Sequence, residues 1–196
     1  METAICTTIK SISRDEWEAC RSSRAGGDPF LSYDFFFLLE TSNSVGPKTG
    51  WIPFYIIFKE KNIVVGIIIS FLKNHSQGEY VFDHSWADAY ERSGGNYYPK
   101  LQVAVPFTPV SGERILVQSE YEDKVGEMIS SAKRLVEENN LSSLHITFCS
   151  KSFVSVAKKN NLLVREGIQY HWFNRGYKSF DDFLGSLTYR KRKNIT

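Results

Sequence analysis

The stretch from Lys73 to Arg114 constrains the fold most, because it separates strand-like segments with a long irregular run. Its prolines, Pro99, Pro106 and Pro109, exclude one continuous helix, since proline lacks an amide hydrogen and clashes with the preceding turn. A loop of this length is usually functional or disordered, and disordered segments are poor in aromatic residues. This stretch is rich in them, at Tyr80, Phe82, Trp86, Tyr90, Tyr97, Tyr98 and Phe107. We therefore predict that it forms the functional surface.

The composition is that of an ordinary globular domain. Of the 196 residues, 42% are hydrophobic and 23% are charged, which suffices for a sizeable core. The three cysteines, Cys6, Cys20 and Cys149, show no metal-type spacing, which is typical of a reducing compartment. The first residues do not show the basic and apolar pattern expected of a signal sequence, and no apolar run approaches the ~20 residues that span a bilayer. We expect a soluble cytoplasmic protein.

The charge balance does not indicate a dedicated nucleic-acid binder. The net charge is +2, from 24 basic and 22 acidic residues. The run from Arg190 to Lys193 is the local exception, although charge runs are usually solvated faces. Contact with RNA through this tail would predict salt-dependent binding that disappears on truncation after Leu187.

The segments around this stretch predict a mixed α/β fold with a helix-covered central sheet. Ala4–Ile9, Trp51–Lys59 and Ile63–Leu72 have strand composition, and the last two are joined by a turn of hairpin length. Capping-box patterns predict helix starts at Ser13 and Ser119. Further strands are expected at 114–117, 144–149, 162–164 and 168–173, and further helices from about 32, at 150–161 and from 179.

The acidic residues of the stretch allow two geometries. Four-residue steps would align a possible metal-binding set on one helix face: His75, Glu79, Asp83, His84 and Asp88. Gly78 and the strand-like residues 79–82 favour an extended run instead, so we predict no metal site. In an extended run Glu79 and Asp83 share one face, while Tyr80 and Phe82 share the other.

Two carboxylates on one face, near a histidine, could act as general base and orienting group. The alternative is that Glu79 and Asp83 accept hydrogen bonds from loop amides and only hold the loop. Trp86, Tyr90, Tyr97 and Tyr98 could line a ligand pocket or pin the loop to the sheet. Lys100 could meet an anionic ligand or be solvated. The sequence contains no phosphate-binding loop, no dinucleotide fingerprint, no GxSxG and no HExxH motif.

The opening stretch, read as KNHSQGEYVFDHSWADAYERSGGNYYPKLQVAVPFTPVSGER, resembles a bacterial family of peptidoglycan biosynthesis/recognition proteins. These are predicted N-acyltransferases related to the FemAB group, with the GNAT fold. The resemblance extends from about Asp28 to Ile195. It includes these flanking segments: Asp28-Pro29-Phe30-Leu31, Glu40, Gly50-Trp51, Tyr170-His171-Trp172, Asn174, Ser179 to Leu184 and Arg190 to Ile195. The chain departs from the family pattern at His84-Ser85, where a more aromatic pair is expected, and at Thr196, where the sequence ends within the basic helix.

The resemblance implies a GNAT-like domain with a central, mixed, mostly antiparallel sheet flanked by helices. Residues 1–178 would form this domain. Residues 179–196 would begin a basic helix that leads to a second GNAT-like domain outside this chain. The full-length protein would move an acyl or aminoacyl group to an amine acceptor, a small molecule or peptide, and this chain alone would be inactive.

A GNAT enzyme holds the pyrophosphate of its acyl carrier with glycine-rich amides at a helix N-terminus. Val110 to Glu113 contain a single glycine, Gly112, before a predicted strand rather than a helix. We therefore expect acyl-CoA or an aminoacyl donor to bind mainly to the second domain, and this half to shape the acceptor site.

These implications assign roles to residues of the stretch. Glu79 and Asp83 are the predicted acid/base residues, with His75 as orienting or alternate base. The predicted substrate-binding residues are Trp86, Asp88, Tyr97, Tyr98, Lys100, Phe107, Thr108 and Arg114. The rival hypothesis is a non-catalytic module that recognises a cell-wall precursor or a protein partner through residues 73–114.

Overall fold

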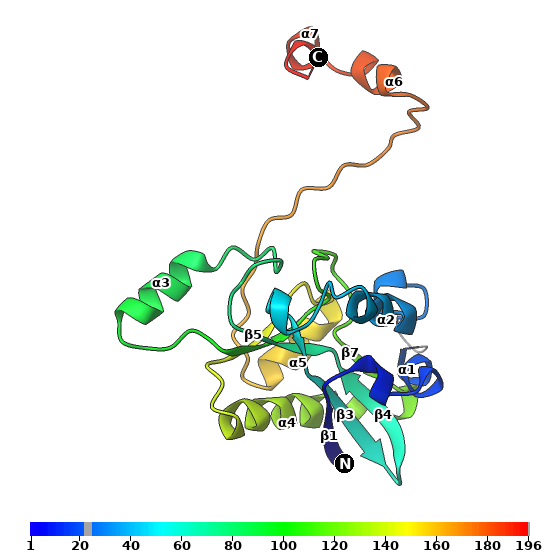
Figure 1. The fold of residues 1–196 in the computed structure, drawn as a ribbon. Helices are drawn as coiled ribbons and strands as arrows, with labels where there is room; N and C mark the ends of the chain where they lie inside the picture. Colours follow the sequence, from blue (N-terminus) through cyan, green and yellow to red (C-terminus); the bar gives the residue numbers. More distant parts are fainter. Residues whose placement is uncertain (22–24, 196) are drawn as a thin grey trace. The chain divides into compact units, whose positions relative to one another are not determined.

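The computed structural model describes residues 1–21 and 25–195 (Figure 1). Thr196, the departure from the family pattern noted in the sequence, lies outside the described residues. The chain divides into two compact units, Met1–Val164 and Arg165–Thr196. None of the helices in the described ranges is long and apolar enough to cross a membrane.

The first sheet of unit 1 has the strand order β1-β3-β4-β7, and all neighbours are antiparallel. Its strands are β1 (Glu2–Cys6), β3 (Tyr55–Glu60), β4 (Ile63–Ile68) and β7 (Ile115–Val117). The predicted hairpin is confirmed as β3–β4. Lys61 and Asn62 in its turn have φ of 50° and 65°, the left-handed values of the turn that matches strand twist.

The second sheet has the order β2-β5-β6-β8. Its strands are β2 (Ile52–Pro53), β5 (Ser70–Lys73), β6 (Lys100–Val103) and β8 (Leu144–Ile146). β6 and β8 are parallel and the other neighbours are antiparallel, so the predicted mixed, mostly antiparallel arrangement is confirmed. This arrangement is divided between two sheets. The hairpin strand β4 of the first sheet continues into β5 of the second, with a break at Ile69.

Helices cover the first sheet on both faces, because successive residues of β3 point in opposite directions. Tyr55 and Ile57 join one core cluster with Trp17 of α1 (Arg14–Arg21) and Phe36 of α2 (Tyr33–Thr41). Ile56 and Phe58 join a second cluster. That cluster also contains Met128 and Ile129 of α4 (Val125–Glu138) and Phe153 of α5 (Lys151–Lys159).

Local signals placed several boundaries correctly. The predicted capping box at Ser13 is confirmed: the Ser13 amide donates to Glu16 Oε2 at 3.0 Å, and the Glu16 amide donates to Ser13 Oγ at 3.2 Å. The helix predicted from about Ser32 is confirmed as α2, and Ser32 is its cap. Phe36 is the buried residue of this helix, and Leu38 is exposed. Short 3-10 helices lie at Ile9–Ser11, Pro29–Leu31, Pro47–Thr49 and Ser119–Lys124.

Three expectations were wrong. The capping box at Ser119 does not start the helix, because Ser119–Lys124 form a 3-10 turn and α4 begins at Val125. The strands predicted at 162–164 and 168–173 are absent from the described residues. A strand needs a hydrogen-bonding neighbour, and this apolar region is exposed instead: Ile168 is 86% exposed. The predicted first strand ends at Cys6 rather than Ile9.

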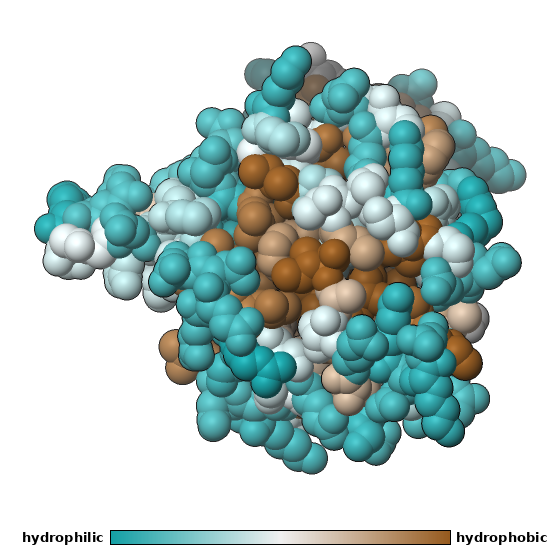
Figure 2. All heavy atoms as spheres, turned by 60° about the horizontal axis from the view of Figure 1, so that its bottom comes forward, coloured by the Kyte–Doolittle hydropathy of each residue, from teal (hydrophilic) through white to brown (hydrophobic). Residues whose placement is uncertain are grey.

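Within the stretch 73–114 the structure has two elements that the sequence did not indicate, β6 and α3 (His84–Arg92). α3 projects from the rest of unit 1 in both views (Figures 1 and 2). Only Ala87 of this helix is buried. Figure 2 also shows apolar side chains gathered on one face of the molecule, ringed by hydrophilic ones.

Unit 2 contains α6 (Phe180–Gly185) and α7 (Tyr189–Lys193). The predicted helix start is confirmed, because Ser179 Oγ accepts from the Asp182 amide at 3.1 Å. Trp172 and Tyr177 pack their rings against Phe183 of α6, at centroid distances of 6.1 and 5.6 Å. These aromatic contacts are the local core of the unit.

Candidate functional site

The second sheet has one apolar and one polar face. Leu101 and Val103 of β6 point into the core beneath α4 and α5, with Leu144 and Ile146 of β8 beside them. The opposite face carries Lys73 of β5, Lys100 and Gln102 of β6, and His145 of β8, because side chains alternate along a strand. Lys73, Lys100 and Gln102 are fully buried. Burial of polar groups is costly unless they are paired, which marks this face as the candidate site.

The loop of residues 74–83 covers the polar face. It turns Ser76, Glu79 and Asp83 inward, where each is buried, while Tyr80 and Phe82 are 49% and 76% exposed. Tyr80 and Phe82 have φ of 57° and 54°, so the predicted alternation arises from left-handed residues and not from a strand. Such conformations cost on the order of 1–3 kcal/mol each in non-glycine residues and cluster at functional sites.

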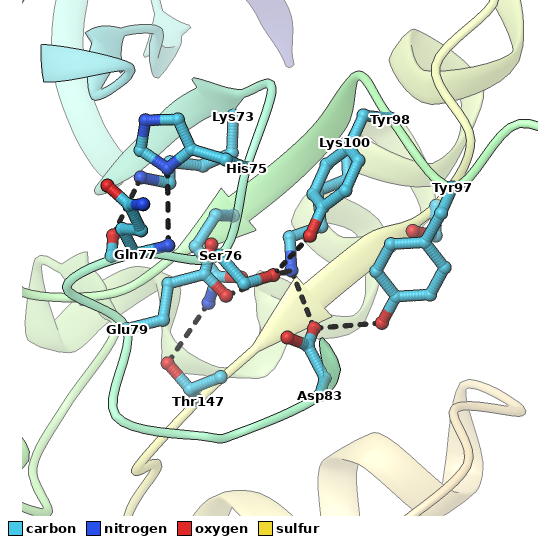
Figure 3. Close-up of polar contacts among 12 residues, drawn as sticks. Lys73, His75, Ser76, Gln77, Glu79, Asp83, Tyr97, Tyr98, Lys100 and Thr147 are labelled. Carbon is cyan, nitrogen blue, oxygen red and sulfur yellow. Dashed lines mark hydrogen bonds and ion pairs between the residues drawn. The ribbon is translucent and has the colours of Figure 1, made fainter. Parts of the chain in front are cut away.

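Lys100 is the centre of the buried polar network (Figure 3). Its Nζ donates to Ser76 Oγ at 2.9 Å, to Glu79 Oε2 at 2.9 Å and to Asp83 Oδ2 at 2.8 Å. All three N–H bonds of the ammonium are therefore used. Lys100 of β6 thus pairs with the carboxylates of the covering loop, whereas the sequence suggested an anionic ligand or solvent.

Two tyrosines complete this network. The Tyr97 hydroxyl donates to Asp83 Oδ2 at 2.8 Å, and the Tyr98 hydroxyl lies 2.8 Å from Ser76 Oγ. The Lys100 ammonium lies 5.2 and 5.5 Å from the centroids of their rings, within cation–π range. Both tyrosines are half-buried, so they close the polar layer at its edge.

Three buried oxygens in this layer have no donor among the described residues. They are Glu79 Oε1, Asp83 Oδ1 and Gln102 Oε1. The amide nitrogen of Gln102 is paired, since it donates to Thr147 Oγ1 at 3.0 Å. Buried polar atoms without partners are few in native structures, and each calls for a physical reason. All three atoms are acceptors, so the group that complements each of them is a donor such as an ammonium or amide N–H.

The two carboxylates differ in basicity. Burial raises the pKa of Glu79, against the opposing effect of Lys100. Burial alone would also raise the pKa of Asp83, but hydrogen bonds from Lys100, Ser76 and Tyr97 lower it to about 2. Glu79 is consequently the better proton acceptor, while Asp83 remains charged and fixes Lys100.

Lys73 lies directly opposite Lys100 in the antiparallel register. Its Nζ donates to the Gln77 carbonyl at 3.2 Å and lies 3.8 Å from the centroid of the Trp51 ring. Burial, with the charge of Lys100, lowers the pKa of Lys73 to about 8, against the opposing charge of Glu79. His75, the predicted alternate base, accepts instead from the Gln77 amide at 3.2 Å. Burial, with the charge of Lys73, lowers its pKa.

His145 is a further member of the face that sequence reasoning missed. Its ring lies 5.9 Å from that of Tyr97, and burial, with the charge of Lys100, lowers its pKa to about 4. Lys73, Ser76 and Gln102 were missed as well. The alternation of Lys100 and Gln102 with Leu101 and Val103 is the signal that could have revealed a strand with one polar face.

The remaining predicted residues lie outside the Lys100 network. Trp86 and Asp88 are exposed on α3. The ring of Phe107 packs 5.5 Å from that of Trp51, and Thr108 Oγ1 donates to the Pro106 carbonyl at 3.0 Å.

Arg114 is buried in the segment that joins β6 to β7. Its guanidinium donates to the carbonyls of Thr147, Glu113 and Val110, at 2.9, 2.9 and 2.5 Å. Burial lowers its pKa to about 10. The bond to Thr147 ties the segment to the backbone after β8, and the other two hold the segment's own backbone.

The N-terminus of α4 does not suit the pyrophosphate of an acyl carrier. Three carboxylates, of Glu120, Glu122 and Asp123, lie in the turn that leads into the helix. Gly112 precedes β7 and pairs with Cys149 instead. A helix N-terminus favours anions, but these fixed negative charges oppose one. In the described part of the chain no group of three His, Cys, Asp or Glu side chains is arranged to hold a metal ion.

Residues 8–196 match the model of the FemAB-like family, described as peptidoglycan biosynthesis/recognition. The chain belongs to this family. No curated protein matches the sequence. Two solved structures of the aminoglycoside N-acetyltransferase AAC(6′)-Iy, one with CoA and one with the bisubstrate analogue CoA-S-monomethyl-acetylneamine, each give a TM-score of 0.51. They are 13% and 12% identical to this FemAB-like chain, cover 89% of it, and are themselves covered over 95% and 99% of their length. At this identity the likeness shows the fold alone, and it confirms the predicted acetyltransferase fold.

Proposed function

We propose that this FemAB-like chain forms the acceptor side of an N-acyltransferase, which moves an acyl or aminoacyl group to an amine. Membership of the family and the acetyltransferase fold support the reaction class. The proposed acceptor site rests on one observation: two buried carboxylate oxygens, Glu79 Oε1 and Asp83 Oδ1, have no hydrogen-bond donor in the described residues. An amine in its ammonium form carries only donors and is the complement of these acceptors.

In this proposal each residue of the network has one task. The amine must lose a proton to become a nucleophile, and Glu79 takes that proton through the oxygen that Lys100 leaves unused. Asp83 keeps its charge and, with Lys100, holds the Glu79 carboxylate in place. The proposal puts the acyl carrier elsewhere than at the N-terminus of α4, and the carboxylates before this helix support that.

A titration with n-propylamine, followed by NMR of the backbone amides, tests this site. We expect binding that Glu79→Gln weakens by about tenfold or more, since a neutral amide loses a charged hydrogen bond. Glu91→Gln, a change of an exposed carboxylate on α3, is the matched control and should bind as the wild type does. Equal affinities of the wild type and Glu79→Gln would refute the role of Glu79, provided that both variants keep their unfolding midpoints.

The second candidate is a non-catalytic module that recognises a cell-wall precursor or a protein partner through residues 73–114. The misfit of an acyl carrier at α4 and the outward-facing Tyr80 and Phe82 favour it. It predicts no binding of a simple amine. Absence of propylamine binding in the wild type would therefore support the module over the transferase.

Several expectations stay predictions. They are the second GNAT-like domain, the division at residues 178 and 179, the cytoplasmic location, and the absence of an RNA-binding role for residues 190–193. Calorimetry with acetyl-CoA on this chain and on a longer chain tests the second domain, because only the longer chain should bind.

A further inference from the structure

Lys73 is a buried cation that the proposed proton transfer does not use. In the described residues its ammonium has a single hydrogen-bond acceptor, the carbonyl oxygen of Gln77, and it rests on the Trp51 ring. No carboxylate there lies within ion-pair distance of its Nζ, whereas Lys100 has two. Two N–H bonds of Lys73 are therefore left without acceptors in a fully buried side chain.

The position of Lys73 adds to the cost of burying its charge. It faces Lys100 directly across the β5–β6 pair, and like charges in this arrangement destabilise a sheet. Glu79 and Asp83 are both bonded to the Lys100 ammonium, although the charge of Glu79 also acts on Lys73. A well-packed apolar side chain at position 73 would avoid the cost of an unpaired buried charge. The retained lysine is accounted for if an anionic group enters the layer.

We propose that Lys73 binds the anionic group of the same acceptor whose amine meets Glu79 and Asp83, so that the acceptor is a short zwitterionic amine. This inference rests on the proposed function and specifies its substrate class. The anionic group is a carboxylate or a phosphate, since either accepts hydrogen bonds from an ammonium.

The register sets the spacing of the two charges. Residues opposite each other in an antiparallel pair have Cα atoms only about 5 Å apart, so the two ammonium groups start from adjacent positions. A ligand that joins Lys73 to the carboxylates bonded to Lys100 carries its amine and its anion within a few bonds. Short amino acids and their phosphate counterparts meet this condition, while a long diamine or a simple alkylamine does not.

The covering loop allows such a ligand to enter. None of the apolar residues between Asn74 and Phe82 is buried, although Gly78 of this loop lies against the rings of Trp51 and Phe107. Lys100 holds the end of the loop that carries Glu79 and Asp83, whereas near Lys73 the loop is held by two hydrogen bonds: Trp51 Nε1 and Lys73 Nζ both donate to the Gln77 carbonyl, at 3.2 Å each. A ligand carboxylate replaces the Gln77 carbonyl as the acceptor of the hydrogen bond from Lys73 Nζ.

Three matched probes test the inference at neutral pH: n-propylamine, β-alanine and propionate. The first has the amine alone, the third has the anion alone, and β-alanine has both on a chain of equal length. We expect the wild type to bind β-alanine at least tenfold more tightly than propylamine, and Lys73→Met to bind the two equally. Lys158→Met, which removes an exposed lysine of α5, should keep the preference. O-phosphoethanolamine, in place of β-alanine, separates a phosphate from a carboxylate.

The outcomes distinguish this inference from the proposed function. If propylamine binds through Glu79 but β-alanine binds no more tightly, or if Lys73→Met keeps the preference, the role of Lys73 is wrong and the amine site stands. If neither amine binds, the proposed function fails. If propionate alone binds and Lys73→Met abolishes it, Lys73 is an anion site without an amine partner, and the zwitterionic class is wrong.

Discussion

At the scale of single residues, Lys100 joins the loop of residues 74–83 to the second sheet. Lys100→Met removes the ammonium that pairs with Glu79 and Asp83 and leaves two buried carboxylates without a cation. Loss of one partner of a buried ion pair costs about 3–5 kcal/mol, so we expect a loss of this size in urea denaturation. Lys73→Met is the matched comparison and should cost little or add stability, because no carboxylate pairs with Lys73. Equal losses in the two variants would contradict this account.

His145 gives the protein a specific acid sensitivity. Its pKa is lowered from 6.5 to about 4 in the folded state, so the unfolded chain binds a proton first as the pH falls. Above pH 6.5 this group does not lower the free energy of unfolding. As the pH falls to about 4, the group lowers the free energy of unfolding by up to about 3 kcal/mol. His145→Gln should remove this part of the pH dependence. Denaturation series at several pH values check it, and parallel curves for the two proteins would show that His145 is not responsible.

At the scale of elements, the covering loop holds left-handed aromatic residues outward at a cost in stability. Phe82→Gly relieves a left-handed φ that costs about 1–2 kcal/mol, against a loss of about 0.5–1 kcal/mol in backbone entropy. We expect the free energy of unfolding to stay constant or to rise by up to ~1 kcal/mol. Val81→Gly, at a neighbour with ordinary φ, is the control and should lower it. A larger loss for Phe82→Gly than for Val81→Gly would mean that the exposed ring stabilises the fold.

The same elements show how far sequence patterns reach. The β3–β4 hairpin and the caps at Ser13 and Ser179 depend on neighbouring residues, and local patterns predicted them. β6 was missed although Lys100 and Gln102 alternate with apolar residues, because the strand has only the four residues Lys100–Val103. The alternation also suggests a solvated face, whereas the covering loop buries it. The strand predicted at 168–173 has the right composition but no partner in the described residues, and pairing is not a local property.

The site was predicted in part: Glu79 and Asp83 do share one inward side. Their shared cation could not be foreseen, because it comes from β6.

At the scale of the whole molecule, the stability of unit 1 should not depend on unit 2. Both core clusters are built from residues up to Leu162, and the aromatic contacts of unit 2 are its own. A chain that ends at Val164 should therefore unfold with a free energy within about 0.5 kcal/mol of the full chain, the range of ordinary surface changes. Urea denaturation of the two chains, monitored by tryptophan fluorescence, measures this.

The shorter chain should also keep the binding of propylamine, since every residue of the Lys100 network precedes position 148. A lower midpoint or a lost amine site in the shorter chain would show that residues 165–196 complete the domain.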